Sequence, residues 1–386
     1  MPDTKKPLNP LQQLQVAGQA VWLDFVDRKF LAEGGLRKLI DADDLTGVTS
    51  NPSIFEKAMG YGDAYDAGFK SWLQTTGADA DVTATYEAQA IDDIRHAADE
   101  LRLTYDRMSG RDGYVSLEVS PYLANDTEGT IAEARRLWAA VDRPNLMVKV
   151  PGTETGVPAI RQLIEDGLNV NVTLLFSQAS YQAVAEAWLA GLDARVQAGK
   201  SVDRIASVAS FFVSRIDAQI DKTIDTRVAA NDAESTALKA LRGKVAIANA
   251  KLAYVWYQAM VASPRWQVLA GQGAMPQRLL WASTGTKDPS YPPTLYIDTL
   301  IGPDTVNTMP PKTMDAFRES GVVTASLTQD VEGAKRTLAE AERLGLDLDG
   351  VTTALVIDGL KQFADAADKL LAAVEKKRVE FQPAAH

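Results

Sequence analysis

Eight short apolar segments, rich in β-branched residues, alternate with longer helical patterns along the chain. Each segment has the length of a β-strand and is bounded by turn or capping residues. The stretches between them place apolar residues three and four positions apart, as one face of an amphipathic helix requires. We therefore expect strands at residues 21–26, 45–50, 114–120, 145–151, 169–176, 206–213, 278–284 and 305–310.

The regular alternation of strand and helix predicts an α/β fold built on a parallel sheet. No Gly-rich GxGxxG turn follows the first strand, which disfavours a doubly wound dinucleotide-binding sheet. Eight strands joined by right-handed helical crossovers instead favour a closed (β/α)8 barrel, the TIM barrel.

The gaps after the second and the sixth strands are each about twice the ~30 residues of a βαβ unit. Both gaps have helical patterns, so we expect additional helices inserted after these two strands. A last helix near residues 351–377 is expected to close the fold, with a loose tail at 378–386. Because no linker-like or charge-rich segment divides the chain, residues 1–386 are expected to form a single domain.

The scarcity of two residue types restricts the chemistry. The 386 residues include no cysteine and only two histidines, His96 and His386. Thiol nucleophiles, cysteine–metal sites, histidine-rich zinc sites and Ser-His-Asp triads are therefore almost ruled out. His96 lies in a helical run of charged residues, where we expect it to be solvated.

The charge balance also restricts the partners. The formal net charge of −11 argues against general binding to nucleic acids or anionic membranes, although a local basic pocket stays compatible with it. The chain has no run of 18 apolar residues, and its first residues lack the apolar stretch of a signal peptide. We therefore expect a cytoplasmic protein.

Polar residues recur inside the expected strands at alternate positions. Side chains in a strand alternate between two faces, and the interior of a barrel is normally filled by branched apolar residues. A polar set that shares one face should therefore converge at the C-terminal mouth of the barrel, where such enzymes react. The residues of this set are Asp24, Thr49, Asn51, Ser116, Glu118, Ser120, Lys149, Asn169, Asn171 and Thr173.

Lys149 lies within the apolar run NLMVKVP. Desolvation lowers the pKa of a lysine toward that of the neutral amine that attacks carbonyls, so this position predicts Schiff-base chemistry. The alternative is a lysine at a strand end that extends into solvent, which is the commoner case for an isolated lysine. The polar residues of the neighbouring strands favour the Schiff base.

Asp24 and Glu118 offer carboxylates for proton transfer and for activating water, although a strand-end carboxylate is as often a helix cap or an ion-pair partner. Asn51 precedes Pro52 and could equally cap the next helix. Arg215 and Ser210, at the end of the sixth strand, would suit a phosphate monoester, whereas a structural pair with Asp217 is the alternative. The turn STGTK offers a weaker anion-binding pattern through Ser283, Thr284, Thr286 and Lys287.

Taken together, several of these strings resemble the transaldolase family, in its longer bacterial branch. They are VTSNPSIF, SLEVSPYLANDTEGT, NLMVKVPGT, NVNVTLLFS, ASFFVSRID and WASTGTKD. The resemblance runs from Asp24 to about Asn307, and it implies the (β/α)8 barrel of the class I aldolases.

The resemblance also implies a role for each matched residue. Lys149 matches the Schiff-base lysine, Asp24 the acid/base aspartate, and Glu118 the glutamate that helps to activate water. The remaining matches are Thr173 beside the catalytic water, and Asn51, Asn171, Ser210, Arg215 and Ser283 around the substrate. Many members of the family follow the seventh-strand serine with a second phosphate-binding arginine. This chain has TGTK there, and Lys287 is the candidate replacement.

The implied activity belongs to the pentose phosphate pathway. A dihydroxyacetone unit moves from sedoheptulose 7-phosphate or fructose 6-phosphate to glyceraldehyde 3-phosphate or erythrose 4-phosphate, with no metal and no organic cofactor. The partners are then sugar phosphates, and either a monomer or a dimer fits. Two alternatives stay open, which are a fructose 6-phosphate aldolase-like activity that releases dihydroxyacetone, and a non-catalytic barrel that serves as a scaffold.

Overall fold

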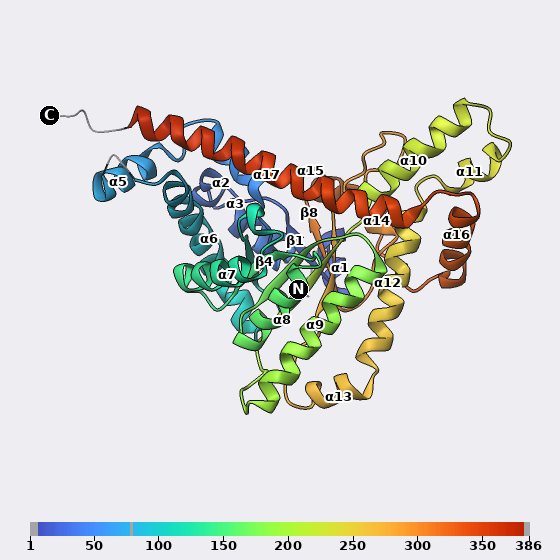
Figure 1. The fold of residues 1–386 in the computed structure, drawn as a ribbon, viewed down its shortest axis with the longest axis horizontal. Helices are drawn as coiled ribbons and strands as arrows, with labels where there is room; N and C mark the ends of the chain where they lie inside the picture. Colours follow the sequence, from blue (N-terminus) through green and yellow to red (C-terminus); the bar gives the residue numbers. More distant parts are fainter. Residues whose placement is uncertain (1–6, 78–79, 382–386) are drawn as a thin grey trace, which may run out of the picture.

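Eight parallel strands close into a barrel in the order of the sequence. The computed structural model (Figure 1) describes residues 7–77 and 80–381. The first strand pairs with both the second and the eighth, which closes the sheet. The strands are β1 (Gln19–Leu23), β2 (Gly47–Val48), β3 (Tyr114–Glu118), β4 (Leu146–Pro151), β5 (Val170–Leu175), β6 (Ser207–Phe212), β7 (Arg278–Ala282) and β8 (Thr305–Met309). The prediction of a (β/α)8 barrel is confirmed.

The strand β2 is much shorter than the segment 45–50 that the sequence indicates. On the β1 side, the N–H groups of Thr46 and Thr49 still donate to β1, so the segment remains extended. On the β3 side, only Gly47 and Val48 keep the register of the sheet. A side chain at Gly47 would lie 2.4 Å from the indole of Trp22, so glycine is required where this indole covers the strand.

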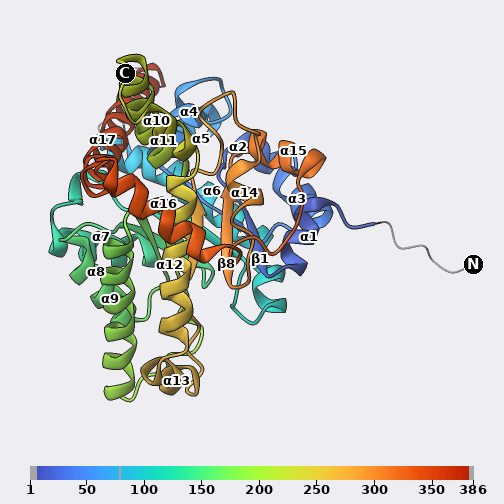
Figure 2. The same ribbon diagram turned by 90° about the vertical axis from the view of Figure 1, so that its right-hand side faces the viewer.

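Helices surround the barrel on all sides, and Figure 2 shows α1, α3 and α15 across the strands from α8 and α9. Up to β6 they are α1 (Pro10–Val16), α2 (Arg28–Ala32), α3 (Gly35–Asp43), α4 (Pro52–Gly60), α5 (Asp66–Thr76), α6 (Val82–Arg107), η1 (Pro121–Leu123), α7 (Thr127–Val141), α8 (Gly156–Asp166) and α9 (Gln178–Gln197). After β6 they are α10 (Ser214–Ala229), α11 (Ser235–Leu241), α12 (Val245–Val261), α13 (Pro264–Ala270), α14 (Leu295–Asp298), α15 (Pro311–Ser320), α16 (Val331–Arg343) and α17 (Leu348–Glu380).

Both predicted insertions are present, as α4 to α6 after β2 and as α10 to α13 after β6. The first insertion is fixed to the barrel by Arg28, whose guanidinium donates to Asp93 and Gln89 of α6. In the second insertion, Asp217 of α10 accepts a hydrogen bond from the N–H of Ala246, in the first turn of α12. No helix among residues 7–77 and 80–381 is both long and apolar enough to cross a membrane.

The helix α17 lies across one end of the barrel in Figure 1, from α10 at one end to α5 at the other. Its glycine at position 359 lies close to β5, because an added Cβ would be 2.8 Å from Leu174 Cδ2. Leu174 itself has φ +61°, at an irregularity of register in β5. The prediction of a loose tail from residue 378 was wrong in part, since α17 continues to Glu380 and Arg378 pairs with Glu375. Residues 382–386 of that expected tail lie outside the described residues.

The opposite end of the barrel is closed by a buried polar cluster around Asp112, which precedes β3. Its side chain is fully buried and pairs with Arg278 of β7 at 3.1 Å. The indole of Trp22 in β1 and the hydroxyl of Thr46 also donate to Asp112, at 2.9 and 3.0 Å. The cluster thus ties the first strand to the seventh inside the barrel, and it leaves the mouth under α17 as the open end.

Candidate active site

A cavity of about 430 Å³ occupies the mouth of the barrel under α17. Residues from the ends of β1, β4, β5, β6 and β8 line it, together with the loops that follow β2 and β7. Among them are eight of the ten residues to which the family resemblance gives a role, namely Asp24, Asn51, Lys149, Thr173, Ser210, Arg215, Ser283 and Lys287. The mouth of a (β/α)8 barrel is where such folds place their reacting groups.

Lys149 is the centre of this cavity. The sheet register places it beside Glu118 of β3 and Asn171 of β5, so the three side chains share the inward face. Only 6% of its side chain is exposed. Its Nζ donates to the carbonyl oxygen of Ser50 at 3.2 Å and lies 3.3 Å from Oε2 of Glu118. The alternative of a lysine extending into solvent is therefore wrong.

Glu118 contacts Lys149 but does not line this cavity, and its side chain is 4% exposed. Burial raises the pKa of this carboxyl, and the nearby ammonium of Lys149 offsets part of that rise. A carboxylate with a raised pKa within 3.3 Å of an ammonium is a suitable acceptor for its proton. The pair can therefore release the neutral amine that nucleophilic attack requires.

Asp24 follows the end of β1 and faces the same cavity. Its Oδ1 accepts a hydrogen bond of 2.7 Å from the hydroxyl of Thr49. The same hydroxyl lies 2.7 Å from that of Thr308 at the end of β8. This short chain of hydroxyls fixes the carboxylate over the mouth, where it can exchange a proton with a bound molecule.

A hydrogen-bond chain inside the barrel confirms the inward face that alternation predicts. The amide of Asn171 donates to Ser116 Oγ on β3 at 3.0 Å and accepts from Ser210 Oγ on β6 at 2.7 Å. Because β3 and β6 are not adjacent to each other, these contacts cross the interior. Asn171 does not line the cavity, so it acts here by orienting Ser210, which does.

Thr173 is fully buried at the end of β5, and its hydroxyl lines the cavity. Within the part of the chain that the structure describes, this hydroxyl has no hydrogen-bond partner. A buried hydroxyl without a partner costs free energy unless a ligand or water supplies one. Thr173 is therefore placed to bind a water molecule or a hydroxyl of a bound molecule.

The cationic end of the cavity is formed by Arg215 and Lys287. Arg215 does not pair with Asp217, and its buried Nη1 has no partner among residues 7–77 and 80–381. Burial lowers the pKa of Arg215, and it also lowers that of Lys287, which the charge of Arg215 lowers further. Ser283 lies beside them with φ +55°, and its hydroxyl is 3.0 Å from that of Ser214. Two neighbouring cations with a free guanidinium nitrogen suit a dianionic phosphate.

The structure places some of the other expected residues at the cavity and others away from it. Asn51 caps α4 by accepting from the N–H of Ile54 at 3.0 Å, which confirms the cap. It also lines the cavity, and its contact with substrate stays a prediction. His96 is half exposed on α6, as expected. Two members of the polar set lie elsewhere, because Asn169 bonds to the loop before β4 and Ser120 precedes η1, outside the cavity.

Several lining residues have no counterpart in the expectations from sequence, among them Thr308, Lys57 and Phe363. Thr308 could have been found by alternation in β8, and Lys57 by its place one helical turn after Ser53 in α4. Phe363 could not, because it comes from α17, far along the chain. Its ring centroid lies 5.9 Å from Nζ of Lys149, so it forms a wall of the cavity beside the amine.

No group of three or more His, Cys, Asp or Glu side chains in the described ranges is arranged to hold a metal ion. The cavity gathers the amine of Lys149, the carboxylate of Asp24, several hydroxyls and two further cations, and Glu118 lies beside the amine. This set can form an imine with a carbonyl compound, move protons and hold a phosphate.

The sequence of this chain is similar to those of a known family and of several known proteins. The sequence model of the family described as Transaldolase/Fructose-6-phosphate aldolase matches residues 21–374. The chain is 47% identical over 379 residues to a transaldolase of Thermobifida fusca, covering 98% of this chain and 99% of that protein. It is 46% identical to a transaldolase of Parafrankia sp. (95% and 98% covered) and 47% identical to one of Thiobacillus denitrificans (95% and 100% covered).

Proposed function

Since this chain belongs to the transaldolase family, and is thus a transferase, we propose that Lys149 forms the Schiff base that carries the transferred unit. The unit is dihydroxyacetone, the donors are sedoheptulose 7-phosphate and fructose 6-phosphate, and the acceptors are glyceraldehyde 3-phosphate and erythrose 4-phosphate. The observation that carries the proposal is the buried amine of Lys149, 3.3 Å from the Glu118 carboxylate and open to the cavity.

The first step joins the ketose to the enzyme. The neutral amine of Lys149 adds to the C2 carbonyl of the donor, and water leaves to give a protonated imine. Glu118 takes the proton of the ammonium before attack, and later activates the water that hydrolyses the product imine. The hydroxyl of Thr173, which has no partner among the described residues, holds this water.

The second step breaks the C3–C4 bond. Asp24 removes the proton of the C4 hydroxyl, the aldose phosphate leaves, and the electron pair of the broken bond moves into the imine to give an enamine. Addition of the enamine to the acceptor aldehyde reverses these events, and Asp24 returns the proton. Thr49 and Thr308 keep the carboxylate in place for both directions.

The remaining residues bind the substrate. Asn51 and Ser210 are assigned to its hydroxyls, with Asn171 holding Ser210 in position. Arg215, Lys287 and Ser283 are assigned to the phosphate, which both donor and acceptor carry at the end away from the transferred unit. Lys287 replaces the second arginine of other members of the family.

The test is to trap the imine. The enzyme is treated with fructose 6-phosphate and borohydride, and the modified peptide is mapped by mass spectrometry. We expect one reduced adduct on Lys149, and loss of both adduct and turnover in Lys149→Met. An adduct on another lysine, or normal turnover in this variant, would refute the assignment.

Transfer itself is measured by supplying fructose 6-phosphate with and without erythrose 4-phosphate. We expect glyceraldehyde 3-phosphate to form rapidly only with the acceptor, because the enamine holds the dihydroxyacetone unit until an aldehyde arrives.

We also propose that the enzyme acts in the cytoplasm and that residues 1–386 form one domain.

A further inference from the structure

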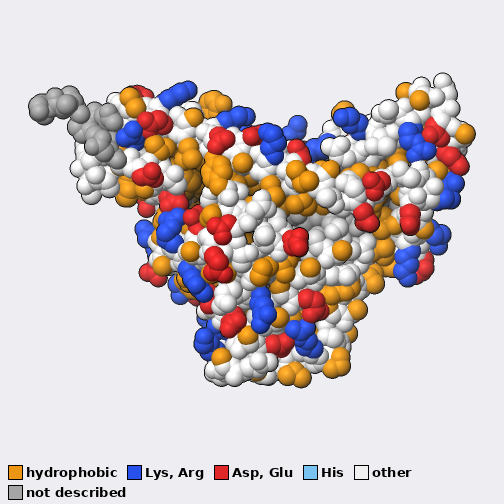
Figure 3. Space-filling view, in the orientation of Figure 1, with side chains coloured by type: hydrophobic (Ala, Val, Ile, Leu, Met, Phe, Trp, Pro, Cys, Tyr) orange, Lys and Arg blue, Asp and Glu red, His pale blue; other side chains and the backbone are white. Residues whose placement is uncertain are grey.

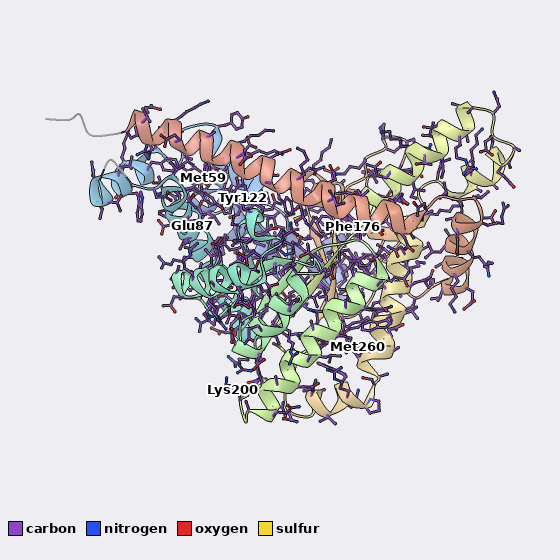
Figure 4. All side chains as sticks on the ribbon, in the orientation of Figure 1. Met59, Glu87, Tyr122, Phe176, Lys200 and Met260 are labelled. Carbon is purple, nitrogen blue, oxygen red and sulfur yellow. The ribbon has the colours of Figure 1, made fainter. Side chains whose placement is uncertain are left out.

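A second cavity lies on the other side of Glu118, between α4, α6, α7, η1 and α17. Its volume is about 340 Å³. Asp81, Thr83 and Tyr122, all exposed, line its outer end. Figure 4 labels Tyr122 beside α17, where its hydroxyl donates to Asp368. The cavity therefore reaches from the surface to the carboxyl group beside Lys149.

The walls of this second cavity are mainly apolar. They include Phe55, Tyr86, Leu117, Leu137, Ala367 and Leu370, which come from five different elements. Figure 3 shows hydrophobic side chains gathered along α17 on this face of the molecule. A space of this size with apolar walls and few polar groups is typical of a site for a small organic molecule.

The polar groups of the second cavity are mostly acidic. Four carboxylates line it, from Asp81, Glu87, Glu118 and Glu133, against one guanidinium, from Arg136. Negative side chains therefore outnumber positive ones in the lining, which favours a cation over an anion.

Three of these carboxylates already have partners. Glu87 accepts hydrogen bonds of 2.7 Å from both terminal nitrogens of Arg136. Glu133 accepts from the N–H of Ser120 at 2.9 Å, and Asp81 caps α6. Arg136 is therefore occupied and does not offer a site for an anion.

Glu118 differs from the other three. Its side chain is 4% exposed, and the ammonium of Lys149, 3.3 Å from Oε2, is its one neighbouring donor among the described residues. It lines this second cavity and not the cavity around Lys149 under α17, to which the sugar phosphates are assigned and which is called the sugar cavity below. A donor placed here would reach the carboxylate from the side opposite to the substrate.

We propose that the second cavity is a ligand site for a small, mainly apolar molecule that carries one protonated amine, and that this amine donates a hydrogen bond to Glu118. The occupied site lowers turnover, because Glu118 then no longer takes a proton from Lys149 or activates water. Only this effect on turnover rests on the proposed function; binding does not.

The probe is N,N-dimethylbenzylamine, which is cationic near neutral pH, carries one N–H donor and forms no imine with sugars. Its binding is measured by isothermal titration calorimetry. We expect it to bind at least fivefold more tightly than benzyltrimethylammonium, which lacks the donor, and phenylacetate to show no binding. Equal affinity for the three probes would contradict the proposal.

Filling the cavity provides the second arm of the test. Ala367→Phe and Ala90→Leu place bulk in the apolar lining, while Ala372→Phe adds the same ring at an exposed position of α17. We expect each filled variant that retains wild-type circular dichroism to bind the probe at least tenfold more weakly, with transfer unchanged without probe. Unchanged binding in the folded filled variants would overturn the proposal.

Kinetics separate this proposal from the proposed function. In the wild type, the probe should lower kcat without raising the KM for fructose 6-phosphate, whereas competition with the sugar would overturn the assignment of the cavity. Binding of the probe should persist in Lys149→Met. The borohydride experiment could give no adduct on Lys149 while the filled variants still bind the probe more weakly. That result would support the ligand site and refute the Schiff-base role of Lys149.

Discussion

Single side chains at the mouth of the barrel are held by neighbours on other strands. Lys149 lies beside Glu118 and Asn171 through the register of the sheet, and Asn171 in turn holds Ser210. The hydroxyls of two threonines fix Asp24 in the same way. At this scale the geometry is set by strand alternation, because residues at the same level of adjacent parallel strands share a face.

Removing the guanidinium of Arg215 tests the phosphate assignment. A hydrogen bond to a charged group contributes about 1.5–3 kcal/mol, so Arg215→Ala should lower kcat/KM for fructose 6-phosphate by about 10- to 100-fold. Activity with unphosphorylated fructose should change little. Lys287→Ala should show the same selectivity with a smaller loss, since its side chain lies at the exposed rim. Equal losses with both sugars would contradict a phosphate role.

The hydroxyl of Thr173 can be removed with little change of shape by Thr173→Val. Because this buried hydroxyl has no partner among the described residues, the free energy of unfolding should change by less than about 1 kcal/mol. Turnover should fall at least tenfold if the hydroxyl holds the reacting water. Steady-state kinetics and urea unfolding check both values, and unchanged turnover would remove Thr173 from the mechanism.

Helix starts and helix contacts connect the insertions to the site. Asn51 both begins α4 and lines the sugar cavity, so the helix cap and the substrate contact are one residue. Asp217 of α10 accepts from Ala246 at the start of α12 and from the hydroxyl of Tyr296, which fixes the second insertion beside β7. At this scale, polar side chains at helix ends decide where the added helices lie.

The two roles of Asn51 are separable by substitution. Asn51→Ser keeps a side-chain oxygen for the cap, whereas Asn51→Ala loses it and should cost about 1 kcal/mol of unfolding free energy. If the amide also binds substrate, the KM for fructose 6-phosphate should rise in both variants. A rise in the alanine variant alone would show that the residue acts only as a cap.

Asp217 should make stability depend on pH. Burial raises its pKa from 3.8 to about 7. Between these values the folded protein binds a proton that the unfolded chain does not, so this contribution to stability is full below about pH 4 and is lost as the pH rises through 7. The slope is about 1.4 kcal/mol per pH unit.

Urea unfolding of the wild type and of Asp217→Asn from pH 4.5 to 8 measures this contribution. The amide cannot ionise, so the variant should gain stability relative to the wild type as the pH rises. Asp225→Asn, at an exposed position of the same helix, is the matched control and should show a constant difference. A constant difference for Asp217→Asn as well would refute the assignment.

The two ends of the barrel differ in structure, since one is closed and the other holds a cavity. One end is closed by the buried Asp112–Arg278 pair and the indole of Trp22, and the other holds the sugar cavity under α17. Stability and chemistry are thus separated along the barrel axis, as is typical of this fold. The first insertion and α17 together enclose the second cavity beside the active site.

Breaking the closed end should affect stability and not activity. Arg278→Met leaves Asp112 buried without its charge partner, which should lower the free energy of unfolding by about 3–5 kcal/mol. The additional change Asp112→Asn should restore part of the loss, because the unpaired charge is removed. Thermal and urea unfolding measure stability, and the kcat of the folded fraction should match the wild type. A loss of kcat as large as in Lys149→Met would contradict this separation.

The sequence alone determined the eight strands, the barrel, both insertions and most polar residues that line the site, because alternation and strand ends are local properties that survive in the barrel. Only the tertiary structure decided what lies above and behind that site. Phe363 reaches this site, and Ala367 lines the second cavity, both from a helix more than two hundred residues after Lys149. Glu118 also borders the second cavity. Such contacts depend on how helices pack over the mouth of the barrel, which no local pattern specifies.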